Sequence, residues 1–352
     1  MFFLGLGTAS PKSRYSQSAC LAALEESAPF DRLSPGSQRL LKRILGRPHG
    51  IEYRHLALTD LGLAFDLTPD ALQDRFAKAA PLLATEAAQT ALQAASHTAI
   101  DIDAVIISTC TGYLCPGLTS YVIESLGLRP DILALDLVGQ GCGAALPNLR
   151  TSEALIHAGR ARNVLSICVE ICSAALYLDD DPGVLVSTCL FADGAGAAVL
   201  SSHKAATGPH VEWVGNESLT EPEHRDRLRF VHRQGMLKNV LSPEVPDLAA
   251  RYAKQVLDGL LARHTLAPSD IQGWILHGGG KNVLDALQTS MALTDSAVEP
   301  SRSVLRDYGN MSSAFVYFVM AYVLARDPAP GFWWLSSFGA GFSCHGALLS
   351  IS

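Results

Sequence analysis

ATEAAQTALQAASHTAIDIDAVIIS (residues 84–108) and AARYAKQVLDGLLARHTLAPSDIQGWILH (residues 249–277) decide the fold, because the two segments follow one pattern. Each begins with a helical segment and continues through a short link and the pair Asp-Ile into an apolar strand. Helix–strand units of this kind are typical of α/β proteins. Their recurrence predicts two units of similar topology.

Further segments recur in the same order. A helix predicted over 142–159 leads into a strand at 163–169, and a helix over about 312–326 leads into a strand at 332–336. Each unit then closes with a Gly-rich turn into a strand, LFADGAGAAVLSS at 190–202 and SFGAGFSCHGALLSIS at 337–352. Any α/β protein alternates helices and strands, but three matches in one order favour an internal duplication.

The predicted strands are continuous apolar runs, such as Val105–Ile107 and Val164–Ile167. Strands of this composition are usually covered on both faces, so two sheets with helices between and outside them would satisfy the burial. We expect the halves to span residues 1–207 and 208–352. Their boundary falls within the polar stretch 201–247, which is either an excursion from the fold or a loop over the functional site.

Composition excludes some classes of function. Of the 352 residues, 48% are apolar and 17% are charged, so most of the chain is expected to pack into a core. The formal net charge of −7 argues against nucleic acid as the main partner. Local basic clusters could still bind a small anionic ligand.

The apolar segments are too short or too interrupted to cross a membrane. The start, MFFLGLGTASP, has no basic residues and contains early glycines and a proline, which predicts a short buried strand rather than a secretion signal. The longest apolar run, Ala314–Ala325, is about half of the ~20 residues that a membrane span needs. We therefore expect a soluble cytoplasmic protein.

The eight cysteines lie in apolar surroundings, where a thiol usually behaves as a small hydrophobic group. Cys168 and Cys172 are spaced like half of a zinc site, but no second pair and no His-x-His follow them. We predict no metal site.

Cys142 is a candidate nucleophile. It lies between two glycines in DLVGQGCGAALPNLR (136–150), where an apolar strand gives way to a helix. The positive end of the helix dipole and the free N–H groups at that position lower the pKa of a thiol. The alternative is a small residue that tight packing requires.

His277 and Asn310 are two further candidates. His277 ends the strand WILH and precedes three glycines, at the strand edge where α/β sheets usually bind ligands. Asn310, in DYGNMSSAF (307–315), precedes a long apolar helix, and asparagine in that position is most often an N-cap. The duplication places Asn310-Met311 opposite Cys142, so two duplicated helix ends would bring the three residues together.

Cysteine, histidine and asparagine also form the active site of papain-like proteases. However, the residue two positions beyond Cys142 is Ala144 rather than an aromatic residue, and Cys142 lies far from the N-terminus. The papain fold is also not duplicated. We therefore disfavour hydrolysis.

Over nearly its whole length the chain resembles the type III polyketide synthases, the chalcone and stilbene synthase-like enzymes of the thiolase superfamily. The matching segments are GTASP (7–11), TGYLCPGLTSYVIESLGLRP (111–130), GQGC (139–142), LFADGAGAAVL (190–200), HGGGKNVLD (277–285), YGNMSSA (308–314) and SFGAGF (337–342). YGNMSSA together with a correctly spaced Cys and His is highly specific. The resemblance implies a thiolase-like five-layer αβαβα fold, a homodimer and no cofactor.

The resemblance also implies an activity. Cys142 would accept a starter acyl group from a CoA thioester, and His277 and Asn310 would support decarboxylative Claisen condensation with malonyl-CoA, followed by cyclisation. One rival is a ketoacyl-ACP synthase III, which shares the fold and the triad types but uses an acyl-carrier protein. A thiolase-fold binding scaffold without activity is the other.

Further site residues follow from the resemblance alone. Phe191 matches the gatekeeper between the CoA tunnel and the cavity, and Cys115 matches a methionine that reaches the partner subunit's cavity. Arg43 and Arg47 match basic residues that face CoA phosphates. In simpler interpretations, Phe191 is a core aromatic residue and the arginines form a solvated helix face. The other predicted pocket residues are Cys110, Thr111, Cys172, Ala175, Ser312, Phe338 and Gly339.

The chain also departs from the family pattern. The usual His-Pro-Gly-Gly is His277-Gly278-Gly279-Gly280, and Cys110, Cys172 and Ala175 stand where plant enzymes often have threonines. These differences keep the catalytic groups but argue against the usual plant products.

Overall fold

The duplicated segments fold as the sequence predicts. In a computed structural model, which describes residues 1–47, 49–204 and 210–352, the first segment covers the end of helix α4 (Pro69–Ala94) and strand β4 (Ala104–Ser108). The second covers most of α8 (Val245–His264) and β11 (Ile271–Leu276). The two helix–strand pairs are equivalent parts of the two halves.

The other predicted pairs are present as well. Helix α6 (Ala145–His157) leads into β6 (Asn163–Ile171), and α11 (Phe315–Leu324) leads into β12 (Gly331–Gly339). The Gly-rich turns lead into the strands that close each half, β7 (Asp193–Ser201) and β13 (Ser343–Ile351). Both central helices are shorter than predicted, because a 3₁₀ turn precedes each one.

Nine strands form one hydrogen-bonded sheet in the order β11-β12-β13-β8-β1-β7-β6-β4-β5. The halves meet where β1 (Phe2–Ala9) pairs with β8 (Val211–Thr220) through only two residue pairs, Phe2 with Glu212 and Phe3 with Val211. The two predicted sheets are therefore joined at one edge. On either side of this joint, β7-β6-β4 corresponds to β13-β12-β11.

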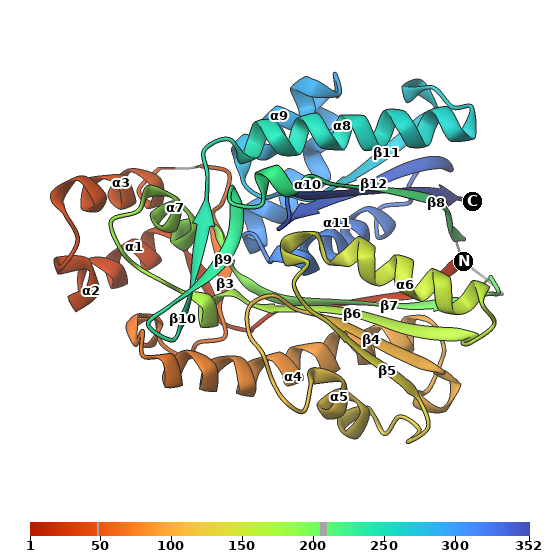
Figure 1. Cartoon of the computed structure of the whole chain (residues 1–352), viewed down its shortest axis with the longest axis horizontal. Helices are drawn as coiled ribbons and strands as arrows, with labels where there is room; N and C mark the ends of the chain where they lie inside the picture. The colour runs from red at the N-terminus through yellow and green to blue at the C-terminus, as the bar shows by residue number, and fades with distance from the viewer. Residues whose placement is uncertain (48, 205–209) are drawn as a thin grey trace.

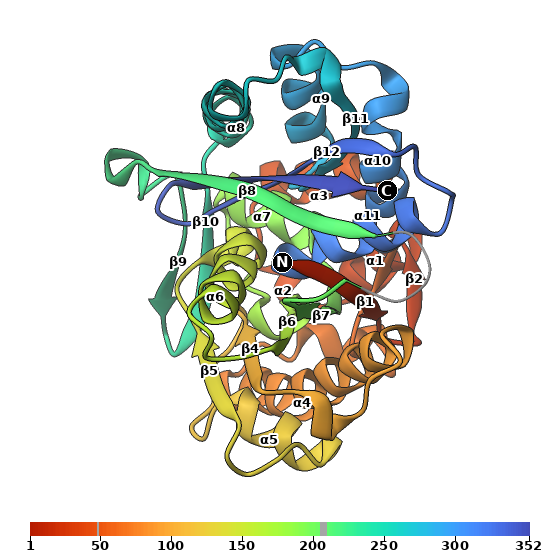
Figure 2. The same cartoon turned by 90° about the vertical axis from the view of Figure 1, so that its right-hand side faces the viewer.

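The sheet halves and the helices form five layers (Figure 1). Helix α8 covers the second-half strands, α4 covers the first-half strands, and α6 and α11 lie between the halves and contact strands of both. Figure 2 shows α8 and α4 at opposite ends of the stack. This is the αβαβα arrangement of the thiolase-like fold. Strands β4 and β6 are fully buried, as their continuous apolar runs predict.

Small residues bring α4 close to β1. Five alanines of α4 have no exposed surface: Ala80, Ala84, Ala87, Ala88 and Ala91. A Cβ at Gly5 would lie 2.3 Å from the Ala91 carbonyl oxygen, and one at Gly7 would lie 2.1 Å from that of Ala87. The glycines in the first strand are therefore required by helix packing.

A group of N-terminal elements, here called the cap, packs against one end of the layers (Figure 1). The cap comprises β2 (Arg14–Ser16), α1 (Gln17–Glu25), α2 (Ala28–Asp31), α3 (Pro35–Leu45), β3 (Tyr53–His55) and the 3₁₀ turn η1 (Leu61–Phe65). The remaining helices and strands are α5 (Leu118–Leu126), β5 (Leu133–Leu137), α7 (Pro182–Leu190), β9 (Leu228–Arg233), β10 (Met236–Leu241), α9 (Lys281–Ser290) and α10 (Asp295–Tyr308).

The polar stretch 201–247 is partly strand and partly hairpin. Strand β8 belongs to the sheet, whereas β9 and β10 form a separate two-stranded sheet beside the cap. The predicted boundary between residues 207 and 208 lies outside the described residues.

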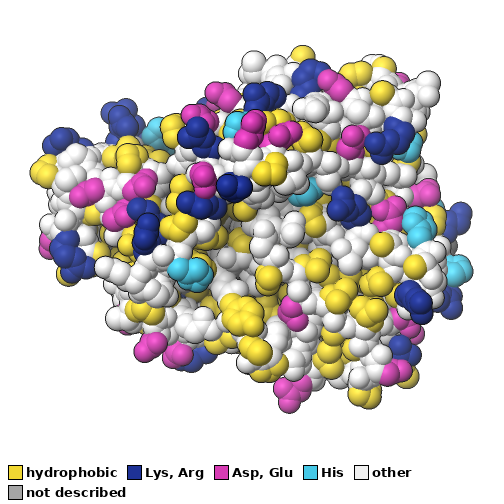
Figure 3. Space-filling view, in the orientation of Figure 1, with side chains coloured by type: hydrophobic (Ala, Val, Ile, Leu, Met, Phe, Trp, Pro, Cys, Tyr) yellow, Lys and Arg dark blue, Asp and Glu magenta, His cyan; other side chains and the backbone are white. Residues whose placement is uncertain are grey.

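Two surface properties bear on the predicted partners. In the described part of the chain, no helix is long and apolar enough to cross a membrane. On the face drawn in Figure 3, Lys and Arg side chains are interspersed with Asp and Glu.

Candidate active site

Cys142, His277 and Asn310 line the same cavity, here called the outer cavity, together with Phe191 and Phe338. It contains about 1820 Å³ of empty space, part of it open to solvent, and extends to exposed side chains at its mouth. The three residues come from different elements: the turn before α6, the end of β11 and the loop after α10. The fold thus brings together the residues that the duplication placed at matching helix and strand ends.

The aromatic rings around His277 fix its position. Its backbone N–H donates to the Ser336 carbonyl at 3.0 Å, which continues the pairing of β11 with β12. The imidazole packs edge-on against Phe315 and Phe338, with ring centroids 5.6 and 4.9 Å away. It is 1% exposed, and neither ring nitrogen hydrogen-bonds to another described residue. Both nitrogens therefore remain available to a ligand.

The glycines after His277 make room for the same two rings. A Cβ at Gly278 would lie 2.7 Å from Phe315 Cζ, and a Cβ at Gly279 would lie 2.7 Å from Phe338 Cζ. Contacts under 3 Å would force the rings to move. Glycine at position 278, where the family usually has proline, therefore fits the packing of the rings around His277.

Asn310 connects three loops of the site. Its backbone N–H donates to the Leu190 carbonyl at 3.0 Å, and its own carbonyl accepts from Ala192 at 2.9 Å, on either side of Phe191. Its side-chain Oδ1 accepts from the Ser312 N–H at 2.9 Å, and Nδ2 approaches the Gly279 carbonyl at 3.3 Å. Asn310 therefore accepts from the first residue of the 3₁₀ turn η7 (Ser312–Ala314), whose N-cap is Met311, and also lines the outer cavity.

A hydroxyl contacts the candidate nucleophile directly. Ser312 Oγ donates to Cys142 Sγ at 3.1 Å, and it also lies 3.3 Å from Glu170 Oε1 and 3.4 Å from Cys110 Sγ. Since a hydroxyl has one proton, it donates to one of these acceptors at a time. Ser312 has a φ of 52°, a backbone conformation that is unusual for residues other than glycine and is common at functional sites.

Glu170 is a site residue that the sequence did not reveal. It is fully buried on β6 and accepts hydrogen bonds from Thr111 Oγ1 at 2.9 Å, from the Cys110 N–H at 3.0 Å and from Ser313. Desolvation raises the pKa of this carboxyl, although its donors oppose the shift. The only available signal was one acidic residue inside the apolar strand NVLSICVEI.

Burial favours neutral forms of both candidate catalytic groups. It raises the pKa of Cys142 to about 12, against the opposing hydrogen bond from Ser312, and it lowers the pKa of His277 to about 3. The prediction that the helix N-terminus lowers the pKa of Cys142 is therefore wrong for the thiol on its own. Desolvation is the largest cause, and the nearby Glu170 carboxylate adds to it.

A second cavity, here called the inner cavity, begins at Cys142 and Phe191, which line both spaces. It contains about 1110 Å³ of empty space, again partly open. Besides Phe191, five predicted pocket residues line it: Cys110, Thr111, Cys172, Ala175 and Ser312. Phe191 thus lies between the two cavities, and its role as a gatekeeper stays a prediction.

The remaining predicted residues are distributed unevenly. Arg43 lines the mouth of the outer cavity, but Arg47 does not line either cavity. Cys115 lies on an exposed loop outside both cavities. Phe338 lines the outer cavity, and Gly339 packs on the turn that holds Cys142, where a Cβ would lie 2.5 Å from the Gly143 nitrogen.

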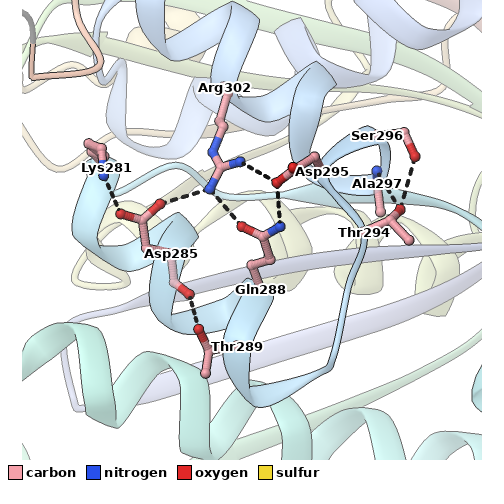
Figure 4. Close-up of polar contacts among 9 residues, drawn as sticks. All are labelled: Lys281, Asp285, Gln288, Thr289, Thr294, Asp295, Ser296, Ala297 and Arg302. Atoms are coloured by element: carbon pink, nitrogen blue, oxygen red, sulfur yellow. Dashed lines mark hydrogen bonds and ion pairs between the residues drawn. The ribbon is translucent and has the colours of Figure 1, made fainter.

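Lys281 is a second site residue that the sequence analysis missed. It lines the mouth of the outer cavity with Arg43 and His49, at the first position of α9. Figure 4 shows Lys281 paired with Asp285, whose other oxygen accepts from Arg302 at 2.8 Å. The mouth therefore has positive charge on two elements, the cap helix α3 and helix α9.

Comparison with known proteins agrees with this geometry. Residues 63–210 match the family model described as FAE1/Type III polyketide synthase-like protein, and residues 227–333 match that of the chalcone and stilbene synthases, C-terminal domain. The 3,5-dihydroxyphenylacetyl-CoA synthase of Amycolatopsis orientalis is 31% identical, over 99% of this chain and 92% of that protein. The chain belongs to the type III polyketide synthases.

Other members of the family are similarly close. The 1,3,6,8-tetrahydroxynaphthalene synthase of Streptomyces peucetius subsp. caesius is 32% identical, over 97% of this chain and 91% of that protein. The crystal structure of PKS-I from the brown alga Ectocarpus siliculosus superimposes with a TM-score of 0.90 at 26% identity, covering 99% of this chain and 97% of that chain. The chain is therefore an acyltransferase of the polyketide synthase class with a thiolase-like fold.

Proposed function

We propose that Cys142 accepts a starter acyl group from a CoA thioester and that the chain is then extended by decarboxylative condensation with malonyl-CoA. One observation carries this assignment: Cys142 lies where the outer cavity, with His277 and Asn310, meets the inner cavity. A thioester can approach from the outer side while its acyl group enters the inner side.

Loading begins with the proton of the thiol. His277 accepts this proton from Cys142, so that the thiolate and the imidazolium form together as an ion pair and neither charge is buried alone. The thiolate attacks the thioester carbonyl, a new C–S bond forms, and the CoA thiolate leaves with a proton from His277. The unpartnered nitrogens of His277 support this role.

Extension uses the same groups as hydrogen-bond donors. His277 and Asn310 donate to the thioester oxygen of malonyl-CoA, which becomes an enolate oxygen as carbon dioxide leaves. The enolate carbon attacks the acyl group on Cys142, and the thiolate is released. No separate base is needed, because decarboxylation generates the carbanion. Backbone N–H groups of the Cys142 turn and of Phe338-Gly339 donate hydrogen bonds to the oxyanion that forms in this attack.

The mouth of the outer cavity suits the phosphates of CoA. Arg43 on α3 and Lys281 on α9 supply cations from two elements, and His49 lies beside them. Phosphate recognition by such pairs is electrostatic and tolerates exposed, flexible side chains. We assign CoA binding to Arg43 and Lys281 but not to Arg47, because Arg47 does not line the outer cavity.

The rival assignments differ in their partners. A ketoacyl-ACP synthase would require a carrier protein, and a scaffold would require no turnover. The test is to incubate the purified chain with malonyl-CoA and a panel of acyl-CoA starters, without carrier protein or added cofactor. We expect polyketide products detectable by mass. Turnover only after addition of an acyl-carrier protein would overturn the assignment to free CoA thioesters. A homodimer and a cytoplasmic location remain predictions.

A further inference from the structure

The inner cavity extends from Cys142 into the cap. Its far wall, here called the distal wall, is formed by Leu24 of α1, Leu45 of α3, Leu56 and Leu58 after β3, and Ala64 and Phe65 of η1. The first five of these are at least nine-tenths buried. The wall is therefore an internal surface and not an open groove.

The distal wall joins two separate apolar clusters. Leu24 and Leu45 belong to a cluster formed by α1, α2, α3 and α7, whereas Leu56, Leu58 and Ala64 form a second cluster beneath η1. The inner cavity lies between these clusters, with residues of both on its wall. Protein interiors usually close such spaces by side-chain packing, so an apolar cavity kept open here indicates an apolar occupant.

Polarity changes along the inner cavity. Hydroxyl groups of Thr111 and Ser312 lie on the side shared with the Glu170 network and Cys142, whereas the Ser173 hydroxyl donates to Asp193 at 2.6 Å. The six side chains of the distal wall are hydrocarbons. Asn239, Ser187 and Thr188 also line the cavity. Asn239 donates to Ser187 Oγ at 3.1 Å, and the hydroxyls of Ser187 and Thr188 donate to carbonyls within α7. Two arginines line the cavity as well, but Arg54 donates to the carbonyls of Thr188 and Phe191, and Arg229 pairs with Asp226 at 3.0 Å. Both therefore already have partners.

This division discriminates between the two possible occupants of the distal end. A growing polyketide carries a carbonyl on every second carbon, and burying these oxygens without hydrogen bonds is unfavourable. A saturated chain has no such groups and gains from each methylene that leaves water. Hydroxyls near Cys142 and hydrocarbons at the distal end match an acyl group that is polar only at its thioester.

We propose that the inner cavity binds the saturated chain of a linear fatty acyl group on Cys142, so that the preferred starter is a fatty acyl-CoA rather than an aryl-CoA or malonyl-CoA. This inference rests on the proposed function. It adds the class of starter, which the family alone does not specify.

The first test is a chain-length series. Initial rates of the first extension are measured for the wild-type protein with saturated acyl-CoAs from acetyl to myristoyl, and with benzoyl-CoA, at fixed malonyl-CoA. We expect kcat/KM to rise by up to about fourfold per added methylene until the cavity is filled. A flat profile, or a preference for benzoyl-CoA or for malonyl-CoA alone, would overturn the proposal.

The second test is a matched pair of variants in η1. Ala64→Phe fills the distal end, whereas Leu63→Phe adds the same ring at the neighbouring position, which is 50% exposed and does not line the cavity. We expect the ratio of kcat/KM for lauroyl-CoA to that for acetyl-CoA to fall at least tenfold in Ala64→Phe and to stay at the wild-type value in Leu63→Phe. An unchanged ratio in Ala64→Phe would contradict the assignment.

Two controls keep the outcomes distinct. Decarboxylation of malonyl-CoA reports whether Ala64→Phe is folded. If Ala64→Phe does not fold, Ala175→Leu takes its place, because it narrows the same cavity from a half-buried position on another element. If Cys142 is loaded from acetyl-CoA and the acetyl group is extended, but the rates do not depend on the chain length of the starter, the fatty-acyl proposal alone is overturned. Failure of every thioester to acylate Cys142 would overturn the proposed function itself.

Discussion

Replacing His277 by glutamine removes the proton acceptor that we propose for Cys142. Burial raises the pKa of Cys142 to about 12, so at pH 7 a thiol of this pKa on its own would be ionised in about one molecule in 10⁵. In the mechanism that we propose, His277 takes the thiol proton, and the attraction between the two opposite charges offsets part of the free energy of burying each one. Glutamine keeps a polar side chain of similar size but cannot accept this proton.

The rate at which iodoacetamide alkylates Cys142 measures the difference. Between pH 7 and 10 we expect the rate in His277→Gln to rise about tenfold per pH unit, because the pKa of Cys142 lies above this range. The wild-type protein should react at least tenfold faster than the variant at pH 7 and show a weaker pH dependence. Peptide mass spectrometry reads Cys142 and the exposed Cys115 separately, so Cys115 is the internal control. Identical pH profiles for Cys142 in both proteins would refute the proton transfer.

Four further substitutions test the other assignments. Asn310→Ala should slow malonyl-CoA decarboxylation by about 10²–10³-fold, measured as carbon dioxide release, and leave acylation of Cys142 largely intact; equal loss of both would contradict its role. Phe191→Ala should change product length or starter range, and an unchanged product profile by mass would make it a core residue. Lys281→Ala and Arg43→Ala should each raise the KM for CoA thioesters several-fold but not for N-acetylcysteamine thioesters, which lack the phosphates; a similar rise for both substrates would argue against phosphate contacts.

Most of the fold follows from local patterns. The repeated helix–strand segments predicted α4 with β4 and α8 with β11, because their periodicity and apolar runs depend on nearby residues alone. The stretch 201–247 was harder to interpret. Strand β8 alternates in burial only over its first three residues and is partly exposed over most of the rest, which includes Asn216 and Glu217. Its place in the sheet therefore depends on pairing with β13 rather than on its own composition.

The candidate site shows the same distinction. Cys142, His277 and Asn310 could be found because each lies at a recognisable strand or helix end. Glu170 could not, because its contacts with Thr111 and Ser313 join residues that are distant in sequence. The pKa of Cys142 was predicted in the wrong direction for a related reason. The sequence reveals the helix that follows the thiol, but not the layers that bury it.

The central claim is that Cys142 carries the acyl group, and mass spectrometry of the protein after a brief incubation with an acyl-CoA tests it most directly. In the absence of malonyl-CoA, we predict a mass increase of one acyl group that maps to the Cys142 peptide and disappears when malonyl-CoA is added. Cys142→Ala should show neither the adduct nor any condensation product. Condensation at the wild-type rate in Cys142→Ala, or an adduct confined to another cysteine, would contradict the account.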